Sequence, residues 1–332
     1  MSDRVSAIPF CVRTADSSLL IRVPHPLTVQ EAVPFRRAFE AELASGGATR
    51  AILDFGGTSL IDSSGIGALV GCLKAARAAD LPIEAWSVCP QVQLALELVG
   101  LSDLLPVQPR SEAILPGVAH RNASERLPVT HPSVRCRTKR LIDIIGALIG
   151  LAFTAVLFVP IAVAIRLDSP GPILFSQPRR GWMGRGFRIW KFRSMVVNAE
   201  ALRATVTNQA EGAFFKNEND PRITAVGRFL RKTSLDELPQ FWNVLVGDMS
   251  LIGTRPPTPD EVERYRIPNW QRFDVRPGLS GEWQVSGRSS IRNFEQVVEL
   301  DLRYQENWSL LYDFKLILRT FAVVFSKQSG AA

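Results

Sequence analysis

Two adjacent carboxylates, Asp236 and Glu237, lie in the stretch KTSLDELPQFWNVLVGDMSLIGTRP (residues 232–256), between a cluster of cations and an apolar run. Paired carboxylates of this kind can serve as a nucleophile, as a general acid and base, or as metal ligands. All three histidines and all four cysteines precede residue 137. Histidine-based proton transfer and thiol nucleophiles are therefore absent from the part of the chain that holds the carboxylates.

A structural explanation competes with the catalytic one for these two residues. Ser234 and Glu237 have the S-x-x-E spacing of a capping box, and an acidic residue in a first helical turn interacts favourably with the helix dipole. Pro239 would break a backbone hydrogen bond in a helix capped at Ser234. We therefore expect a helix that begins nearer Asp236 or kinks at Pro239.

Charge divides the chain into two parts. Residues 1–133 carry a net charge of −2 and residues 134–332 a net charge of +9, so the formal charge of +7 comes entirely from the second part. The polar, proline-punctuated stretch LPGVAHRNASERLPVTHPSVR between them is typical of a linker. We predict a first domain over residues 1–115, a linker over 116–136 and a second domain over 137–330.

Residues 144–165, IIGALIGLAFTAVLFVPIAVAI, contain no charged side chain and are long enough to cross a bilayer as a helix. Arginine and lysine residues flank both ends, whereas a simple crossing should have its cation excess on one side. Because Pro160 interrupts helical hydrogen bonding, we predict that a membrane segment of about residues 141–167 enters the membrane, bends and returns to the cytoplasmic face. A buried core helix and an ordinary single span are the alternatives.

The first 115 residues alternate between strand and helix patterns, which predicts a small α/β domain. The strands are expected at SLLIRV, RAILDFGG, IEAWSV and LLPV, and the helices at residues 29–46, 64–80 and 90–100. The stretch from LIDSSGIGALVGCLKAARAAD to residue 105 resembles the STAS domain of anti-sigma-factor antagonists. The resemblance implies that Ser63 is a candidate phosphorylation site, although Asp62, Ser63 and Ser64 are equally good helix N-cap residues.

The second part contains a series of motifs in a recognisable order: KRLIDIIGALIG, SPGPILFSQPRRGWMGRGFRIWKFRSM, DPRITAVGRFLRKTSLDELPQFWNVLVGDMSLIGTRP, VRPGLSGEWQVSGR and LDLRYQENWSLLYDFKLILRT. Together they resemble the bacterial sugar transferase family, the monotopic enzymes that transfer a sugar phosphate to a polyprenyl phosphate. The expected fold is a mostly α, membrane-associated domain with a re-entrant helix.

The resemblance implies covalent catalysis by Asp236 and Glu237 with Mg²⁺, Asp236 being also the metal ligand. Asp236 would attack the β-phosphorus of a UDP-sugar and expel UMP, and undecaprenyl phosphate would then take the sugar phosphate. Such a reaction begins the synthesis of an exopolysaccharide, O-antigen or other glycoconjugate. It brings several phosphates beside a carboxylate, which requires nearby cations.

The candidate groups for binding the phosphates or the nucleotide are Arg255, Lys191, Arg193, Arg222, Arg276, Gln284 and Arg288. Arginine suits this role because its planar fork matches phosphate oxygens, but each of these cations could equally be solvated or face lipid. Arg255 matches the arginine of the family's Pro-Arg-Pro motif. Thr254 replaces the first proline, which puts the rigidity of that motif in doubt.

The expected location is the cytoplasmic face of the bacterial inner membrane. The first residues lack the apolar region of a signal peptide, and the spacing of Cys11, Cys72, Cys89 and Cys136 indicates neither a zinc site nor a disulfide framework. Residues 309–327 have the pattern of an amphipathic helix, which could lie on the membrane surface or pack on the protein core.

Two other functions compete with the transferase. The chain could be a regulatory protein in which the STAS-like domain pairs two chains or recruits a protein partner and the transferase part is inactive, but the intact Asp236–Glu237 pair argues against this. Nucleic-acid binding is not expected, because the cations flank an apolar segment and glycine-rich motifs rather than an aromatic-studded groove.

Overall fold

The computed structural model describes residues 11–13, 17–108, 131–209, 215, 217, 219–287, 291 and 293–325. Two compact units divide the chain, one formed by Met1–Thr130 with two short later segments, the other by most of the remaining residues. Most of the predicted linker, residues 116–136, lies outside the described residues.

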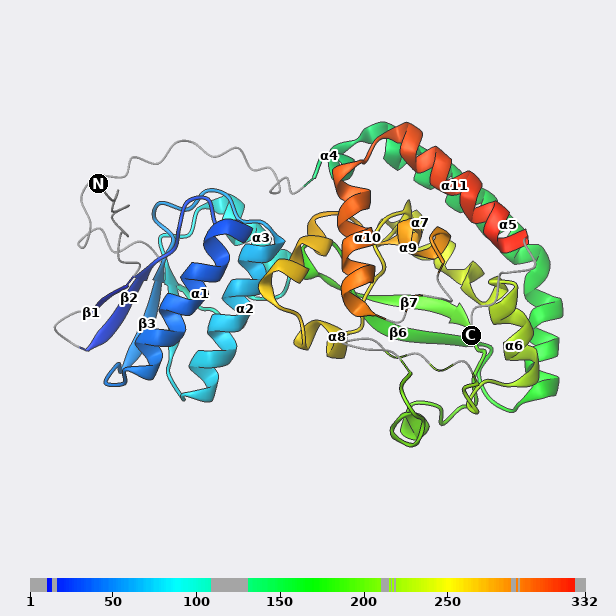
Figure 1. The fold of residues 1–332 in the computed structure, drawn as a ribbon, viewed down its shortest axis with the longest axis horizontal. Helices are drawn as coiled ribbons and strands as arrows, with labels where there is room; N and C mark the ends of the chain where they lie inside the picture. The colour runs from blue at the N-terminus through cyan, green and yellow to red at the C-terminus, as the bar shows by residue number, and fades with distance from the viewer. Residues whose placement is uncertain are drawn as a thin grey trace. The chain divides into compact units, whose positions relative to one another are not determined.

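The first unit contains a five-stranded sheet in the order β1-β2-β3-β4-β5, in which β1 is antiparallel to β2 and the other neighbours are parallel. Helices α1 and α2 lie side by side in Figure 1. The elements are β1 Cys11–Arg13, β2 Ser18–Arg22, α1 Val29–Ala44, β3 Arg50–Asp54, α2 Ser63–Ala78, β4 Ile83–Trp86, α3 Pro90–Leu98 and β5 Val107–Gln108.

The predicted elements of this unit are present, with two differences at the edges of the sheet. Strand β1, which the sequence pattern did not predict, pairs with β2. The predicted strand LLPV is shorter than expected, because the backbone N–H groups of Leu104 and Leu105 both donate to the carbonyl of Leu101 in a turn. Only Val107–Gln108 pairs with β4.

The second unit is largely helical, with two small two-stranded sheets. Its elements are α4 Pro132–Arg135, α5 Arg137–Asp168, β6 Leu174–Arg180, β7 Gly186–Phe192, the 3₁₀ helix η2 Ala201–Thr205, α6 Ala225–Lys232, the 3₁₀ helix η3 Leu235–Gln240, α7 Phe241–Val246, β8 Ser250–Ile252, α8 Pro259–Glu263, β9 Gly278–Ser280, α9 Glu282–Val285, α10 Phe294–Glu306 and α11 Leu310–Phe325. Strands β6 and β7 form an antiparallel hairpin, and β8 pairs in parallel with β9.

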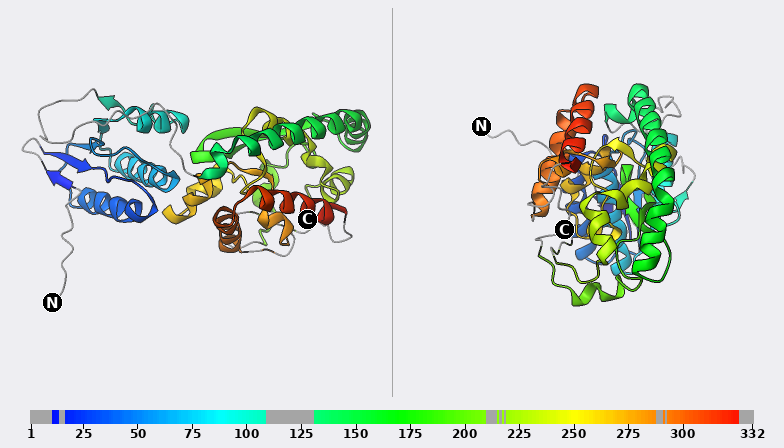
Figure 2. Two further views of the ribbon diagram at one scale, coloured as in Figure 1. Left: turned by 90° about the horizontal axis from the view of Figure 1, so that it is seen from above. Right: turned by 90° about the vertical axis from the view of Figure 1, so that its right-hand side faces the viewer.

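Helix α5 is long and apolar enough to cross a membrane, and only 28% of its most hydrophobic window is buried in the protein. A buried core helix, one of the predicted alternatives, would have most of this window buried, so the low burial of α5 argues against that alternative. The helix is bent rather than straight in Figures 1 and 2, as a helix containing Pro160 should be. Its exposed large side chains are Leu141, Ile142, Ile145, Leu148, Ile149, Phe153, Val156, Val159, Val163 and Leu167.

The inward face of α5 is built from small residues. A side chain on Gly146 would come within 2.5 Å of Leu251, and one on Gly150 within 2.5 Å of the ring of Phe241. Ala147 is fully buried in the same row and packs in a cluster with the core of β7 and α7. The small side chains allow α5 to lie close to the segments that flank the carboxylate pair.

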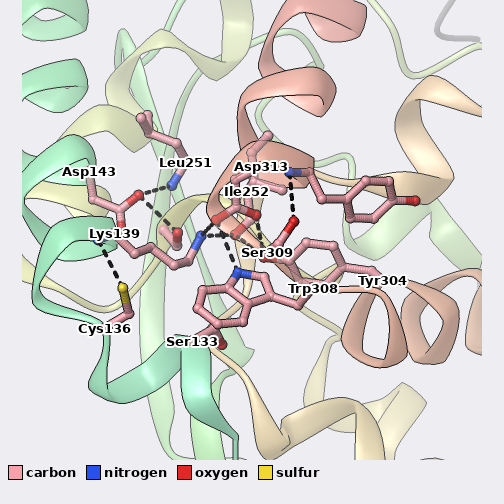
Figure 3. Close-up of polar contacts among 12 residues, drawn as sticks. Ser133, Cys136, Lys139, Asp143, Leu251, Ile252, Tyr304, Trp308, Ser309 and Asp313 are labelled. Carbon is pink, nitrogen blue, oxygen red and sulfur yellow. Dashed lines mark hydrogen bonds and ion pairs between the residues drawn. The ribbon is translucent and has the colours of Figure 1, made fainter.

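Polar side chains hold the first turns of α5 in place (Figure 3). The Lys139 ammonium lies 2.7 Å from an Asp313 carboxylate oxygen of α11 and donates to the carbonyl of Ile252 at 3.0 Å. One turn later, an Asp143 oxygen accepts from the Ser250 hydroxyl and from the Leu251 N–H, both at 2.9 Å. These contacts position β8, and with it the segment that leads to Arg255.

The C-terminal helix α11 has two different faces. Leu316 is fully buried and packs in a cluster with Ile252, Val275 and Tyr304. The other face exposes Leu311, Phe314, Leu318 and Phe321. Packing on the core, one of the two predicted alternatives, is therefore observed for one face, and the exposed face is apolar.

Candidate active site

The carboxylate pair lies in the 3₁₀ helix η3, and the capping box suggested by the sequence does not form. Ser234 adopts a left-handed conformation with φ 55°, and its side chain makes no capping hydrogen bond. The segment Leu235–Gln240 instead winds as a 3₁₀ helix that leads into α7. A 3₁₀ helix has three residues per turn, so Glu237 and Gln240 share one face and Asp236 lies on the next.

Glu237 forms an ion pair with Lys191 of β7. The Lys191 Nζ and the Glu237 Oε1 are 2.8 Å apart, and both side chains are less than a quarter exposed. Asp236 is more deeply buried, with 5% of its surface exposed. The two carboxylates of this short helix thus have different surroundings. Glu237 lies beside a lysine and is partly exposed, whereas Asp236 is buried in the protein.

A pocket with a volume of about 240 Å³ opens beside Glu237. Four cations line it against the single carboxylate, together with two carboxamides and three aromatic rings. The lining residues are Arg179, Ile189, Lys191, Phe215, Arg231, Glu237, Gln240, Arg255, Pro256, Gly278, Leu279, Trp283, Gln284, Phe294 and Val297. The charge balance of the pocket favours an anionic ligand.

Arg255 is held in the pocket by the helix that follows it. Its two terminal nitrogens lie 2.7 and 3.0 Å from the two carboxylate oxygens of Glu261. Glu261 also completes a capping box with Thr258 at the start of α8, so a single carboxylate caps the helix and orients the arginine. Burial opposes ionisation of Glu261, but Arg255 and Arg179 lower the net pKa of its carboxyl group.

Arg179 is a second buried cation next to Arg255. Burial and the charge of Arg255 lower the pKa of its guanidinium to about 10. It donates to the Pro256 carbonyl at 2.9 Å and to the Gln177 side chain at 2.6 Å. Two neighbouring arginines with one shared carboxylate leave an excess of positive charge, which is the arrangement that phosphate oxygens stabilise.

Thr254, which stands at the position of a family proline, is anchored by its own side chain. It is 3% exposed, and its hydroxyl donates to the Arg272 carbonyl at 3.1 Å. Its backbone carbonyl accepts from the Gly278 N–H at 2.9 Å. The hydrogen bonds restrain the backbone before Arg255, so a proline ring is not required for an ordered segment.

We expect Thr254→Val to lower the free energy of unfolding by about 1–2 kcal/mol, because the buried Arg272 carbonyl loses its donor while the shape of the side chain is kept. Denaturant unfolding of the detergent-solubilised protein measures this change. Thr205→Val, which removes an exposed hydroxyl from η2, is the matched control and should change stability by less than about 0.5 kcal/mol. Equal effects of the two substitutions would contradict the anchoring role of Thr254.

Two of the predicted phosphate-binding arginines have backbone or carboxylate partners outside the pocket lining. Arg193 donates to the carbonyls of Pro170 and Ser169 at 2.5 and 2.7 Å, just beyond the end of α5. Arg222 forms a buried ion pair with Asp220 at 2.6 Å. Both are held by the fold in the absence of substrate.

The remaining candidates divide between the pocket and the rest of the unit. Lys191, Arg255 and Gln284 line the pocket together with Glu237. Arg276 does not line it; burial and the nearby Arg140 lower the pKa of its guanidinium. Arg288 lies outside the described residues.

Much of the pocket lining was not predicted from the sequence, including Arg179, Arg231, Gln240 and Phe215. Arg231 and Gln240 flank the carboxylate pair in the same stretch, RKTSLDELPQ, and this proximity was the available signal. Phe215 is separate in sequence from the carboxylate pair, and its ring lies 5.0 Å from the guanidinium carbon of Arg222. No local pattern could have placed that ring at the pocket.

The donor set suits a magnesium ion that arrives with its substrate. Across the described residues, no group of three histidine, cysteine, aspartate or glutamate side chains could hold a metal ion alone. Mg²⁺ is commonly bound by one or two protein carboxylates and completes its shell with substrate phosphates and water. Asp236 and Glu237, beside a cation-lined pocket, fit that pattern.

Ser63, the candidate phosphorylation site of the first unit, is fully buried at the start of α2. The helix is capped by Asp62, which accepts from the Gly65 N–H at 2.8 Å. Burial is the largest effect on Asp62 and raises the pKa of its carboxyl group. Phosphorylation of Ser63 would therefore require the start of α2 to open.

The family described as bacterial sugar transferase matches residues 134–327, which is more than half of the chain. The chain belongs to this family. The STAS domain family matches residues 10–114. The first unit therefore has a STAS-like fold, and the second is a sugar transferase domain with one long apolar helix.

Three relatives illustrate the similarity. A galactosyl transferase, CpsE, from Streptococcus agalactiae is 52% identical over 56% of this chain and 42% of its own length. A UDP-glucose:undecaprenyl-phosphate glucose-1-phosphate transferase from Escherichia coli is 41% identical over 55% of this chain and 39% of its own. The exopolysaccharide production protein ExoY from Sinorhizobium fredii is 36% identical over 58% of this chain and 88% of its own. The match therefore spans about two-fifths of the first two relatives.

Among solved structures, the unphosphorylated anti-sigma factor antagonist SpoIIAA aligns with 31% of this chain and 87% of its own, with a TM-score of 0.28 and 20% sequence identity.

Proposed function

We propose that the protein transfers a sugar 1-phosphate from a UDP-sugar to undecaprenyl phosphate, releasing UMP, and so begins the assembly of a surface polysaccharide or glycoconjugate. The observation that carries the proposal is the pocket in which Glu237 of the carboxylate pair faces Arg179, Lys191, Arg231 and Arg255. A UDP-sugar and a polyprenyl phosphate are both anionic, and the named activity of the Escherichia coli relative joins these two substrates.

In the proposed mechanism Asp236 is the nucleophile. One of its carboxylate oxygens bonds to the β-phosphorus of the UDP-sugar while the bond between that phosphorus and the bridging oxygen breaks, and UMP leaves with the bridging oxygen. An oxygen of undecaprenyl phosphate then attacks the same phosphorus and returns the carboxylate of Asp236. Division into two displacements replaces one difficult step by two easier ones.

The other polar groups of the site bind and balance charge. Arg255 and Arg179 would hold phosphate oxygens, and the ion pair with Lys191 orients Glu237 next to the nucleophile. Asp236 and Glu237 would hold Mg²⁺. The ion would neutralise the negative charge that develops on the phosphoryl oxygens.

We also propose that α5 enters the membrane from the cytoplasmic side, bends and returns. Three features support this topology: the exposed apolar side chains of α5 and α11, the bend of α5, and the cations at both ends of α5.

The topology predicts that the first and second units both lie on the cytoplasmic side. Single cysteines introduced at Arg50 and at Arg264 should therefore react with a membrane-impermeant thiol reagent only when the cytoplasmic face of the inner membrane is exposed to it. A cysteine-free background is required, and protection at both positions by intact cells is the expected result. Labelling of one position from outside intact cells would instead establish a single crossing.

The transferase activity is tested by UMP release. Protein purified in detergent is mixed with Mg²⁺, undecaprenyl phosphate and each of UDP-galactose, UDP-glucose, UDP-N-acetylgalactosamine and UDP-N-acetylglucosamine. Repeated turnover with one or two of these donors, dependent on the lipid phosphate, is the expected result; without the lipid, at most one UMP should be released per protein molecule. Folded, lipid-bound protein that releases UMP from none of them would favour a regulatory role for the chain.

A further inference from the structure

Two carboxamides in the pocket have polar atoms that the fold does not satisfy. Gln240 is 3% exposed, and its Nε2 is buried with no hydrogen-bond acceptor among the described residues. The Oε1 of Gln284, in α9, is likewise buried with no donor among them. Both residues line the pocket beside Glu237. A buried amide without a partner costs free energy, so such groups in a pocket indicate that a ligand supplies the partner.

The winding of η3 places Gln240 next to Glu237 of the carboxylate pair. Residues three apart lie one above the other on a 3₁₀ helix. Gln240 is therefore stacked on Glu237, and both side chains reach the pocket lining. With the transferred phosphate bound at the carboxylate pair, as the proposed function requires, a donor group at this position lies close to the sugar attached to that phosphate.

The chemistry of the two amides differs from that of the other lining groups. The arginines and the lysine are suited to phosphate oxygens. The Gln284 oxygen is an acceptor, and it is repelled by an ionised phosphate, which offers no hydrogen to donate. A sugar hydroxyl can accept from the Gln240 Nε2 and can donate to the Gln284 Oε1, so the sugar ring satisfies both amides.

We propose that Gln240 and Gln284 bind hydroxyl groups of the donor sugar and that Gln240 selects which sugar is transferred. The proposal rests on the proposed transferase function. Sites that hydrogen-bond a substrate hydroxyl discriminate strongly against analogues that lack it, because their own polar groups are then left unpaired. Gln240 is thus a specificity-determining residue one turn after the carboxylate pair.

The test compares wild type with Gln240→Ala and Gln240→Met; the second keeps the length of the side chain without adding a charge and removes the donor. The kcat/KM for the accepted UDP-sugar should fall about 10- to 100-fold in both variants. Inhibition by UMP should stay within about twofold of wild type, because UMP carries the uracil, the ribose and one phosphate but lacks the transferred sugar. Gln93→Ala, on an exposed face of α3, is the control and should match wild type.

A second arm uses UDP-sugars that each lack one hydroxyl. The analogue missing the hydroxyl that Gln240 binds should be a poor substrate for wild type and should lose no further activity in Gln240→Ala. Gln284→Ala tests the acceptor independently, and it decides the question if the Gln240 variants do not fold.

Several results would overturn the proposal. Unchanged kcat/KM in both Gln240 variants would do so. Weakened UMP inhibition that equals the loss of kcat/KM would also do so, since that result assigns the amide to the uracil, the ribose or the phosphate of the nucleotide. Equal losses for every sugar and every deoxy analogue would also reject it. Wild-type protein that is inactive with all donors rejects the transferase function itself, which is a separate outcome.

Discussion

Asp236→Asn is expected to abolish UMP release, with a loss of about 10³-fold or more, because an uncharged amide cannot replace the carboxylate as a nucleophile. The variant should also fail to form a phosphorylated protein. Wild type mixed with a UDP-sugar labelled at the β-phosphate, without undecaprenyl phosphate, should retain label after denaturation. The label should be released by hydroxylamine, which cleaves acyl phosphates.

Two further variants sharpen this experiment. Asp260→Asn in α8, where the carboxylate is 69% exposed, is the matched control and should retain activity and label. Glu237→Gln should still accept label, more slowly, because it removes the partner of Lys191 and not the nucleophile. Label that persists in Asp236→Asn and disappears in Glu237→Gln would assign the nucleophile to Glu237, the member of the pair that lines the pocket.

Arg272→Met is expected to lower the free energy of unfolding by about 3–5 kcal/mol. Arg272 is 1% exposed, and its guanidinium lies 2.5 Å from a carboxylate oxygen of Asp301, which is fully buried. It also donates to the Tyr265 hydroxyl and, at 3.2 Å, to the Arg255 carbonyl. Removing the guanidinium leaves a buried carboxylate without its counter-charge and weakens the support of Arg255.

Denaturant unfolding followed by circular dichroism measures this loss. Arg203→Met is the control, because Arg203 pairs with Asp260 at 3.3 Å on the surface, and it should change stability by less than about 1 kcal/mol. Arg272→Met combined with Asp301→Leu should recover much of the stability, since neither charge is then left alone. A loss below about 1 kcal/mol in the single variant would show that Asp301 is stabilised by other groups.

A second consequence of the same network is functional. Thr254 binds the Arg272 carbonyl, and Arg272 binds the Arg255 carbonyl, so the buried pair supports the backbone on both sides of the pocket arginine. The replacement of a family proline by Thr254 is therefore compatible with an ordered Arg255. The departure from the motif does not by itself indicate an inactive transferase domain.

Local sequence patterns were sufficient for much of the organisation. Alternating apolar residues such as those of β2, and helical periodicity in α1 and α2, depend on short-range spacing, and the structure contains these elements where they were expected. The charge-free run with Pro160 predicted a long bent helix for the same reason. The order of the transferase motifs indicated the family, to which the match over residues 134–327 shows that the chain belongs.

The two-part organisation and the apolar helix could therefore be predicted from the sequence, and the adjacent carboxylates could be singled out as candidates, because each depends on composition or on residues close along the chain. The tertiary structure decided which cations reach the pocket: Arg193 and Arg222 look like Arg255 in sequence, but nearby carbonyls and Asp220 bind them elsewhere. It also decided that η3 winds as a 3₁₀ helix, so that Gln240 follows Glu237 into the pocket. Asp220 is only two residues from Arg222, but the partners of Arg193 and the residues that meet at the pocket come from distant segments, which no local pattern specifies.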